Sequence, residues 1–286
     1  MKTILLGAAA LAAISLASAA NAQTFSTGYV GGSYTTVNTG DSKAHTNDAQ
    51  IFAVRGVASF ELAKNLETQL DGDVAAVDFG IPAYSNVTTW GPTAHVFLDK
   101  DGNKIGAFVG YEDAGNDSVT AYGLEARMAS GPFTFGATAG FGSLNAPGTT
   151  YNNDLRTYRG QVSYFVNENL RIDVSGDSFR VSNNNRFSKG SLTVFGIGGE
   201  FQPMGFPVSL TAGVEQSSVS GHTYDAYTVG VRKSFGGTLK DRDRKSSPFD
   251  SVAQNYGGAL GLLETSLDGA SYRAQHCVTT VQSCAN

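Results

Sequence analysis

The chain has 286 residues, a formal net charge of −5, 35 glycines and only 7 prolines. The acidic balance argues against nucleic acid as a partner. Abundant glycine, tyrosine and phenylalanine with little proline favour long strands over disorder. No stretch after the N-terminal region approaches 18 consecutive apolar residues, which excludes a helical membrane protein.

The first 22 residues have the features of a secretory signal. Lys2 supplies a positive end, residues 4–17 are mostly apolar, and Ala20-Asn21-Ala22 forms a small-x-small cleavage site. We expect cleavage before Gln23, which removes one positive charge and moves the net charge from −5 to −6. The apolar run is too short for a retained membrane anchor. The site lacks a lipobox cysteine, so a lipoprotein is not expected.

Residues 25 to 235 contain twelve segments in which apolar and polar residues alternate. A period of two over about ten residues indicates strands and excludes helices. Shorter and longer gaps alternate between the segments. The predicted strands are 25–37, 51–62, 66–77, 87–98, 104–112, 119–130, 133–142, 156–166, 170–181, 191–201, 208–218 and 224–235.

The segment 51–62 shows the pattern most clearly. Phe52 and Phe60 fall on one face, and Arg55 and Glu61 fall on the other. The first segment is the weakest because its glycines blur the alternation. Asp99-Lys100-Asp101-Gly102-Asn103 predicts a hairpin turn. It has the first spacings of a calcium loop, but it lacks the required later glycine and glutamate.

These segments predict an all-β fold, a transmembrane antiparallel up-and-down β-barrel of about 12 strands over residues 23–236. Each segment is long enough to cross a bilayer when tilted. A soluble β protein is the alternative, but the apolar face ends in aromatics and the other face carries mixed charges, as in membrane barrels. An even strand count places both termini in the periplasm and the longer gaps outside. The aromatics are Phe60, Tyr111, Tyr122, Tyr164, Phe201 and Phe235.

The charges on the polar face are the candidate pore-lining residues. Twelve strands lie between a filled small barrel and a wide aqueous one. The charges therefore either line a narrow pore or pair into a salt-bridged core. Inward glycines (Gly106, Gly110, Gly123, Gly136 and Gly230) favour a narrow water-filled lumen, and the acidic excess predicts a mild cation preference. The predicted lining residues are Arg55, Glu67, Asp71, Asp73, His95, Glu125, Arg127, Arg159, Arg171, Asp173, Asp177, Glu215 and Arg232, and Glu61 shares their face.

The last predicted strand carries a family resemblance. Thr228, Gly230 and Phe235 resemble the terminal-strand signal of Gram-negative outer-membrane barrels, although Lys233 stands where an aromatic is usual. The signal usually closes the chain, whereas 51 residues (286 minus 235) follow Phe235 here.

The junction after this strand is similar to that of porin-like barrels of alphaproteobacteria, which carry a comparable run just past the last strand. The run here is Lys240-Asp241-Arg242-Asp243-Arg244, preceded by Gly236-Gly237-Thr238-Leu239. The resemblance implies a porin-like protein of the bacterial outer membrane. Its partners would be outer-membrane lipid, the barrel assembly machinery and small solutes or ions.

Residues 237–286 are predicted to be a periplasmic tail with a short helix. The alternating charges of Lys240–Lys245 predict a solvated connector. Ser247-Pro248-Phe249-Asp250 has the features of a helix start. Helical spacing follows, weakened by Gly257 and Gly258. The tail is either partly helical and partly disordered, or a plug or gate folded against the periplasmic mouth. The spaced apolar residues are Phe249, Val252, Ala253, Tyr256, Leu260, Leu263 and Leu267.

The two cysteines, Cys277 and Cys284, lie in this tail. In an oxidising periplasm they are candidates for a small disulfide loop. The alternative is two free thiols. Metal binding is not expected, because His276 is the only nearby third ligand.

No enzymatic or cofactor site is expected. His95 lies mid-strand with no nucleophile beside it, and nothing near His45 or His222 forms a triad. The glycines at 28–32 lack the Lys-Ser/Thr pair of a phosphate loop.

The sequence therefore predicts a narrow, porin-like channel for passive diffusion of small solutes or ions, exported to the bacterial outer membrane. The alternative is a structural or adhesion barrel that acts through outer loops at 38–50, 143–155 and 182–190. An outer-leaflet lipid enzyme is a third class, and it would require hydrolase activity.

Overall fold

The computed structural model describes residues 24–39, 49–78, 87–114, 117–145, 153–182, 189–219, 222–246 and 249. These residues form twelve strands and one helix. The elements are β1 (Thr24–Thr39), β2 (Ala49–Ala63), β3 (Leu66–Asp78), β4 (Val87–Lys100), β5 (Asn103–Ala114), β6 (Asp117–Ser130), β7 (Phe133–Asn145), β8 (Asn153–Asn167), β9 (Leu170–Ser182), β10 (Lys189–Phe201), β11 (Val208–Val219), β12 (His222–Phe235) and α2 (Leu239–Ser246).

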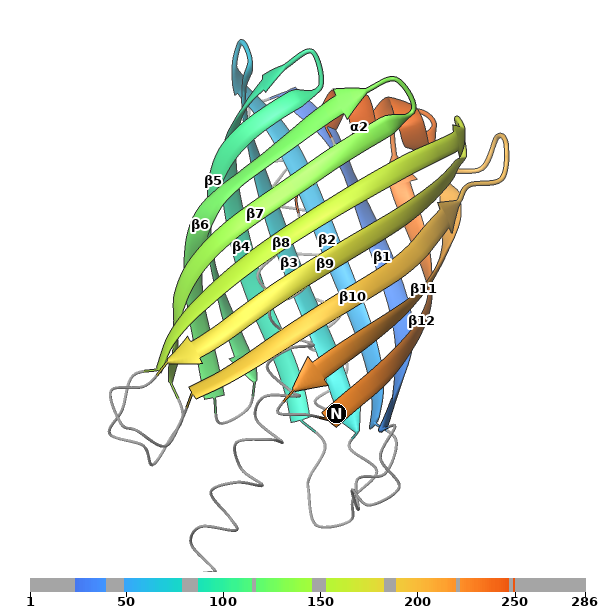
Figure 1. Cartoon of the computed structure of the whole chain (residues 1–286). Helices are drawn as coiled ribbons and strands as arrows, with labels where there is room; N and C mark the ends of the chain where they lie inside the picture. The colour runs from blue at the N-terminus through green and yellow to red at the C-terminus, as the bar shows by residue number, and fades with distance from the viewer. Residues whose placement is uncertain are drawn as a thin grey trace, which may run out of the picture.

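The strands form one closed antiparallel barrel (Figure 1). Each strand pairs with its neighbours in sequence, and β1 pairs with β12 to close the sheet. In that closing pair Gly28 lies opposite Phe235, and Tyr34 lies opposite Val229. All twelve predicted strands are confirmed, and each predicted segment falls within the observed strand.

Alternating burial along each strand separates the two faces of the barrel wall. In β4, Trp90, Val96 and Leu98 are exposed on the outside, whereas His95 and Phe97 are buried on the inside. Side chains on a strand alternate between its two faces, so the alternation of apolar and polar residues determines which residues form the outer surface of the barrel and which face its interior. The outer surface is a band of exposed apolar residues, as in barrels that face lipid.

The two ends of the barrel differ in their connections. The turn end carries the connections 64–65, 101–102, 131–132, 168–169 and 202–207, together with the end of β12. The loop end carries 40–48, 79–86, 115–116, 146–152, 183–188 and 220–221. The predicted alternation in length therefore holds in outline, but two of the loop-end connections have only two residues. At 101–102, positive φ angles of 56° at Asp101 and 80° at Gly102 fit a tight type I′ hairpin turn, as predicted.

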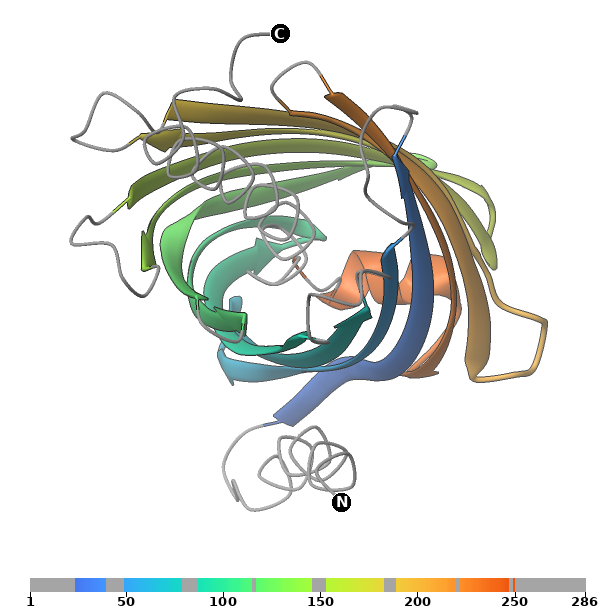
Figure 2. The ribbon, with the colours of Figure 1, turned by 90° about the horizontal axis from the view of Figure 1, so that it is seen from below.

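The chain turns back into the barrel after β12. Gly236 and Gly237 both have positive φ angles, and a side chain at Gly237 would collide with Asp241. This glycine pair leads into α2, which lies inside the ring of strands (Figure 2). The expectation that Lys240–Lys245 forms a solvated connector is wrong, because these residues are helical and Asp243 is buried.

Several predictions fall on residues outside the described part of the chain. These are the signal segment 1–22, the cysteine pair and most of the helix expected to start at Ser247. The observed helix α2 begins at Leu239, and Phe249 is the last described residue. No helix within the described residues is long and apolar enough to cross a membrane.

Candidate pore

Every predicted lining residue lies on the inward face of its strand, opposite the exposed apolar side chains. The alternation of apolar and polar residues therefore predicted the inward orientation of these side chains correctly. The residues differ greatly in exposure: His95 is fully buried, whereas Glu215 is exposed to the lumen. That they line a conducting pore stays a prediction.

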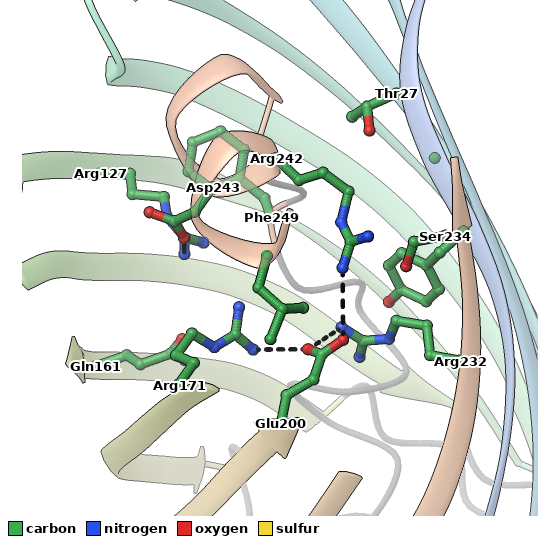
Figure 3. Close-up of a pocket in the computed structure, with 13 residues that line it drawn as sticks. Thr27, Arg127, Gln161, Arg171, Glu200, Arg232, Ser234, Arg242, Asp243 and Phe249 are labelled. Atoms are coloured by element: carbon green, nitrogen blue, oxygen red, sulfur yellow. Dashed lines mark hydrogen bonds and ion pairs between the residues drawn. The ribbon is translucent and has the colours of Figure 1, made fainter. Parts of the chain in front are cut away.

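Glu200 of β10 is the centre of an ion-pair cluster at the turn end (Figure 3). Its carboxylate lies 3.3 Å from Arg171 Nη2 and 2.9 Å from Arg232 Nη1. Arg242 of α2 approaches to 3.8 Å, and the Ser209 hydroxyl donates to the same carboxylate. The buried Glu200 carboxylate thus connects strands β9 and β12 of the barrel wall to α2 inside it.

Most of the other predicted charges are also paired. Arg55 lies 3.1 Å from Asp71, and Arg159 lies 3.2 Å from Asp177. Arg171 Nε lies 3.0 Å from Asp173. Of the two alternatives that the sequence left open, the structure shows the paired arrangement on much of the wall. It also keeps the open space described below.

His95 bridges two carboxylates inside the barrel. Its Nε2 lies 2.8 Å from Asp71 Oδ2, and its Nδ1 lies 2.8 Å from Glu125 Oε1. Gln69 Nε2 donates to the same Asp71 oxygen at 2.8 Å. Both ring nitrogens are engaged by acids, so this histidine is placed to tie β3, β4 and β6 together.

Phe249 docks on this network. Gln69 contacts its backbone twice: the Phe249 N–H donates to Gln69 Oε1 at 2.9 Å, and Gln69 Nε2 donates to the Phe249 carbonyl at 2.9 Å. The phenyl ring stacks on His95 with centroids 6.0 Å apart and packs edge-on against Phe97 at 5.2 Å. The side chain of Phe249 is only 5% exposed. The wall therefore holds the main chain and the ring of this residue together.

The helix that precedes Phe249 begins with a capping box. The Thr238 hydroxyl accepts from Asp241 N–H at 3.1 Å, and the Asp241 carboxylate accepts from Thr238 N–H at 3.2 Å. These reciprocal bonds satisfy backbone donors that a helix start leaves open. The bond from the Thr238 N–H lowers the pKa of Asp241 below its ordinary value.

Both ends of α2 are attached to turns of the barrel. Near its start, Lys240 N–H donates to the Glu168 carbonyl at 3.1 Å, in the β8–β9 turn. Near its end, Arg244 Nη2 donates to the carbonyls of Gly131 at 2.8 Å and Phe133 at 3.1 Å, at the β6–β7 turn. The helix therefore crosses part of the opening at the turn end.

Asp243 fixes the middle of the helix to the wall. Its carboxylate accepts from Arg127 Nη2 and from the Thr134 hydroxyl. Burial by itself raises the pKa of Asp243, but Arg127 and Thr134 outweigh it and hold the pKa below its ordinary value. The carboxylate is therefore charged at neutral pH and attracts Arg127.

Two of the spaces inside the described part of the barrel lie beside these ion pairs. The larger, about 300 Å³, opens among β1–β5, β11 and β12 and is lined by Arg55, Asp73 and Glu112. The smaller, about 70 Å³, lies between the wall and α2 (Figure 3). Tyr29 and Arg232 line both, with the Arg232 guanidinium carbon 4.1 Å from the centre of the Tyr29 ring.

Part of the inner wall is apolar, which the sequence patterning did not predict. We call this group the apolar stripe; its members are buried and contact one another, and Tyr224 packs against them. The stripe consists of Phe108, Val119, Ala121, Leu155, Phe179, Leu192 and Val194. Phe108 lies in the middle of β5, and the others lie in the halves of β6 and β8–β10 nearer the loop end.

The inward glycines do less to widen the lumen than expected. A side chain at Gly123 would collide with the Phe108 ring, and one at Gly106 would collide with Phe97. A side chain at Gly123 would also collide with the Ala139 carbonyl, and one at Gly106 with the Val96 carbonyl, so these glycines make room for the backbone of a neighbouring strand as well as for aromatic side chains. Gly136 has more space, since its nearest neighbour is a Gln161 side-chain carbon 3.7 Å from an ideal Cβ.

Several residues of this interior were not among the predicted lining residues. Glu200 directly precedes the outward Phe201, so alternation alone would have placed it inside. Lys104 and Glu112 follow from the same rule on β5. Gln69 follows from the same rule on β3, where it shares a face with Asp71 and Asp73. The position of Phe249 had no local signal, because it depends on contacts about 180 residues apart in sequence.

No family model matches the chain, and no curated protein matches it in sequence. Among solved structures, it is similar to an outer-membrane channel from Pseudomonas putida F1, with a TM-score of 0.55 and 9% identity over 76% of this chain and 98% of that one. The translocator domain of the autotransporter NalP from Neisseria meningitidis has a TM-score of 0.47 and 10% identity, covering 80% and 98%. The KdgM porin has a TM-score of 0.46 and 13% identity, covering 72% and 99%.

At 9% identity, the likeness to the Pseudomonas channel shows the fold alone. The fold is that of an outer-membrane β-barrel, which supports a location in the outer membrane. Within the described residues, no group of three or more His, Cys, Asp or Glu side chains is arranged to hold a metal ion.

Proposed function

We propose that this protein is a porin-like channel for passive diffusion of small solutes or ions, restricted at its turn end by α2 and Phe249. The observation that carries the proposal is the space of about 300 Å³ within a closed barrel, where the charged residues Arg55, Asp73, Glu112 and Arg232 stand among apolar ones. A cavity of this size is large enough for several waters. The proposed mechanism has no catalytic step: solutes are selected by size and by the inward charges.

Planar-bilayer recording of the purified protein tests this function. Discrete conductance steps from a chain that ends at Thr238, which lacks α2 and Phe249, support a channel. Silence from that folded barrel would contradict it and favour a structural or adhesion role.

We further propose a mild cation preference. On the described strands the inward acids outnumber the inward bases. The acids are Glu61, Glu67, Asp71, Asp73, Asp99, Glu112, Glu125, Asp173, Asp177, Glu200 and Glu215, and the bases are Arg55, Lys104, Arg127, Arg159, Arg171 and Arg232. Charged side chains in a narrow pore set its ion selectivity. In a potassium chloride gradient the reversal potential should favour potassium, and a value favouring chloride would refute the preference.

A further inference from the structure

Two acids that line the larger cavity lie in one row across three neighbouring strands. Asp73 of β3 lies opposite Gly91 of β4 in the strand register. On the other side of β4, an ideal Cβ at Gly91 would lie 3.0 Å from the Cα of Glu112 on β5. Because the residue between the two acids has no side chain, the space between their carboxylates is left open to the cavity.

Both acids carry a buried oxygen that has no hydrogen-bond partner among the residues that the structure describes. These oxygens are Glu112 Oε2 and Asp73 Oδ1, and Glu112 as a whole is only 2% exposed. The next inward acid on β3 differs, since Asp71 binds Arg55 at 3.1 Å and His95 at 2.8 Å. A buried carboxylate is unfavourable unless a donor or a positive charge compensates it. Asp73 and Glu112 are therefore placed to accept hydrogen bonds from a ligand.

The two bases at this cavity are each bonded to a different acid. Arg55 lies opposite Asp73 in the β2–β3 register, but its guanidinium donates to Asp71. Arg232 Nη1 lies 2.9 Å from the Glu200 carboxylate. The pair formed by Asp73 and Glu112 therefore leaves an excess of negative charge at the cavity, which favours a cation as the ligand.

Beside these acids, the wall of the cavity is apolar on β2 and β3. Ile51 lies opposite Val77, and Ala53 lies opposite Ala75. All four side chains line the cavity and are half-buried, and we call them the β2–β3 patch. The patch continues from the charged row toward the loop end of the two strands. A ligand that contacts both the acids and the patch has a positive end and an apolar body.

We propose that Asp73 and Glu112 bind the positive end of a small organic cation, whose apolar body lies on the β2–β3 patch. An alkylammonium group suits the two acids, because its three N–H donors can bond to both carboxylates at once. The cavity of about 300 Å³ has room for a body of several carbon atoms. As the class of solute that the barrel passes, this inference rests on the proposed channel function, whereas binding itself does not require conduction.

Calorimetric titration of the full-length chain in detergent micelles tests this site. The probe is n-butylammonium chloride, and micelles without protein provide the blank. Glu112→Gln and Asp73→Asn each keep the shape of the side chain and remove its charge. The matched control is Asp113→Asn, which removes the acid next to Glu112 on the outer face of β5, where it accepts from the Tyr111 hydroxyl at 3.3 Å.

The unaltered chain and Asp113→Asn should bind the probe with the same dissociation constant. Glu112→Gln and Asp73→Asn should each raise that constant by about tenfold or more, because each loses a hydrogen bond between charged groups. Heat-dependent gel migration confirms that each variant forms the barrel. No binding to the unaltered chain, or equal binding to all four proteins, would overturn the proposal.

Two further probes test the chemistry of the ligand. Ammonium chloride has the charge without the apolar body and should bind about tenfold more weakly or less, since each buried methylene adds to the affinity. Butanoate has a similar chain with the opposite charge and should not bind. Equal affinity for ammonium would show that the β2–β3 patch takes no part, and equal affinity for butanoate would refute recognition of the positive charge.

The outcomes separate this site from the channel function. If the chain that ends at Thr238 conducts but the full-length chain does not bind n-butylammonium, the site fails and the channel stands. If the full-length chain binds the probe but the shorter chain is silent, the site stands and the channel function fails.

Discussion

At the scale of single residues, the interior of this barrel depends on side chains that contact several partners at once. Glu200 joins Arg171, Arg232 and Arg242. Gln69 contacts both Asp71 and the backbone of Phe249. Because such groups are buried, removing one partner leaves another charge or dipole without compensation, at a cost of a few kcal/mol.

Phe249 is the residue whose replacement should widen the turn end most directly. Phe249→Ala removes the ring that packs on His95 and Phe97, and truncating a buried phenylalanine costs about 3 kcal/mol or more. We expect a higher mean conductance in planar bilayers than for the unaltered chain. Phe206→Ala, at a 64% exposed position in the β10–β11 connection, is the matched control and should change nothing. Equal conductance of both variants would argue against a role for Phe249.

At the scale of elements, α2 is held across the turn end by its capping box, by two turns and by Asp243. The cap and the turns contact the helix at its ends, whereas Asp243 attaches its middle to Arg127 and Thr134. A helix of eight residues is too short to be stable alone in water, so these contacts determine whether it stays in place.

Replacing Asp243 should therefore loosen α2. Breaking a buried ion pair costs about 3 kcal/mol, which corresponds to an increase on the order of 100-fold in the population of the undocked helix. We expect trypsin to cleave the Asp243→Ala variant after Arg242 and Arg244 on the order of 100-fold faster than the unaltered chain, while the barrel stays intact.

The contact between Asp243 and Arg127 should also depend on pH. Because the pKa of Asp243 is lowered, the unaltered chain should lose this contact only as the pH falls through that lowered pKa.

Glu168→Ala provides the control for this experiment. It removes an acid that contacts the same helix, but the Glu168 carboxylate is 58% exposed and lies 3.5 Å from Lys240. An exposed pair contributes at most about 1 kcal/mol, so cleavage should rise by less than about tenfold. Similar cleavage of the two variants would show that Asp243 is not the main anchor.

The same elements show why the fold was predictable from sequence and the position of α2 was not. A period of two identifies a strand and also fixes which side chains face inward, as for Arg55 and Asp173. The segment Lys240–Lys245 was not predictable in this way. Taken alone, its alternating charges predict a solvent-exposed connector, whereas the segment is helical and Asp243 is buried. Their partners, Glu168, Glu200 and Arg127, lie far away in sequence and come close only when the barrel closes.

At the scale of the whole molecule, the barrel is asymmetric inside as well as outside. Its outer surface is apolar around the circumference. Inside, β1–β5 with β11 and β12 surround the larger cavity, whereas the apolar stripe covers β5, β6 and β8–β10. The turn end carries α2 within the ring of strands (Figure 2). This arrangement gives a lumen that is narrowed by the chain's own C-terminal region.

The most direct test compares single-channel conductance of the full-length chain with that of the chain ending at Thr238, in the same planar bilayers. If α2 and Phe249 restrict the lumen, the shorter chain should give well-resolved steps several-fold larger than those of the full-length chain. Equal conductance of the two would contradict the restriction by α2 and Phe249. Silence of both folded proteins would contradict the channel itself.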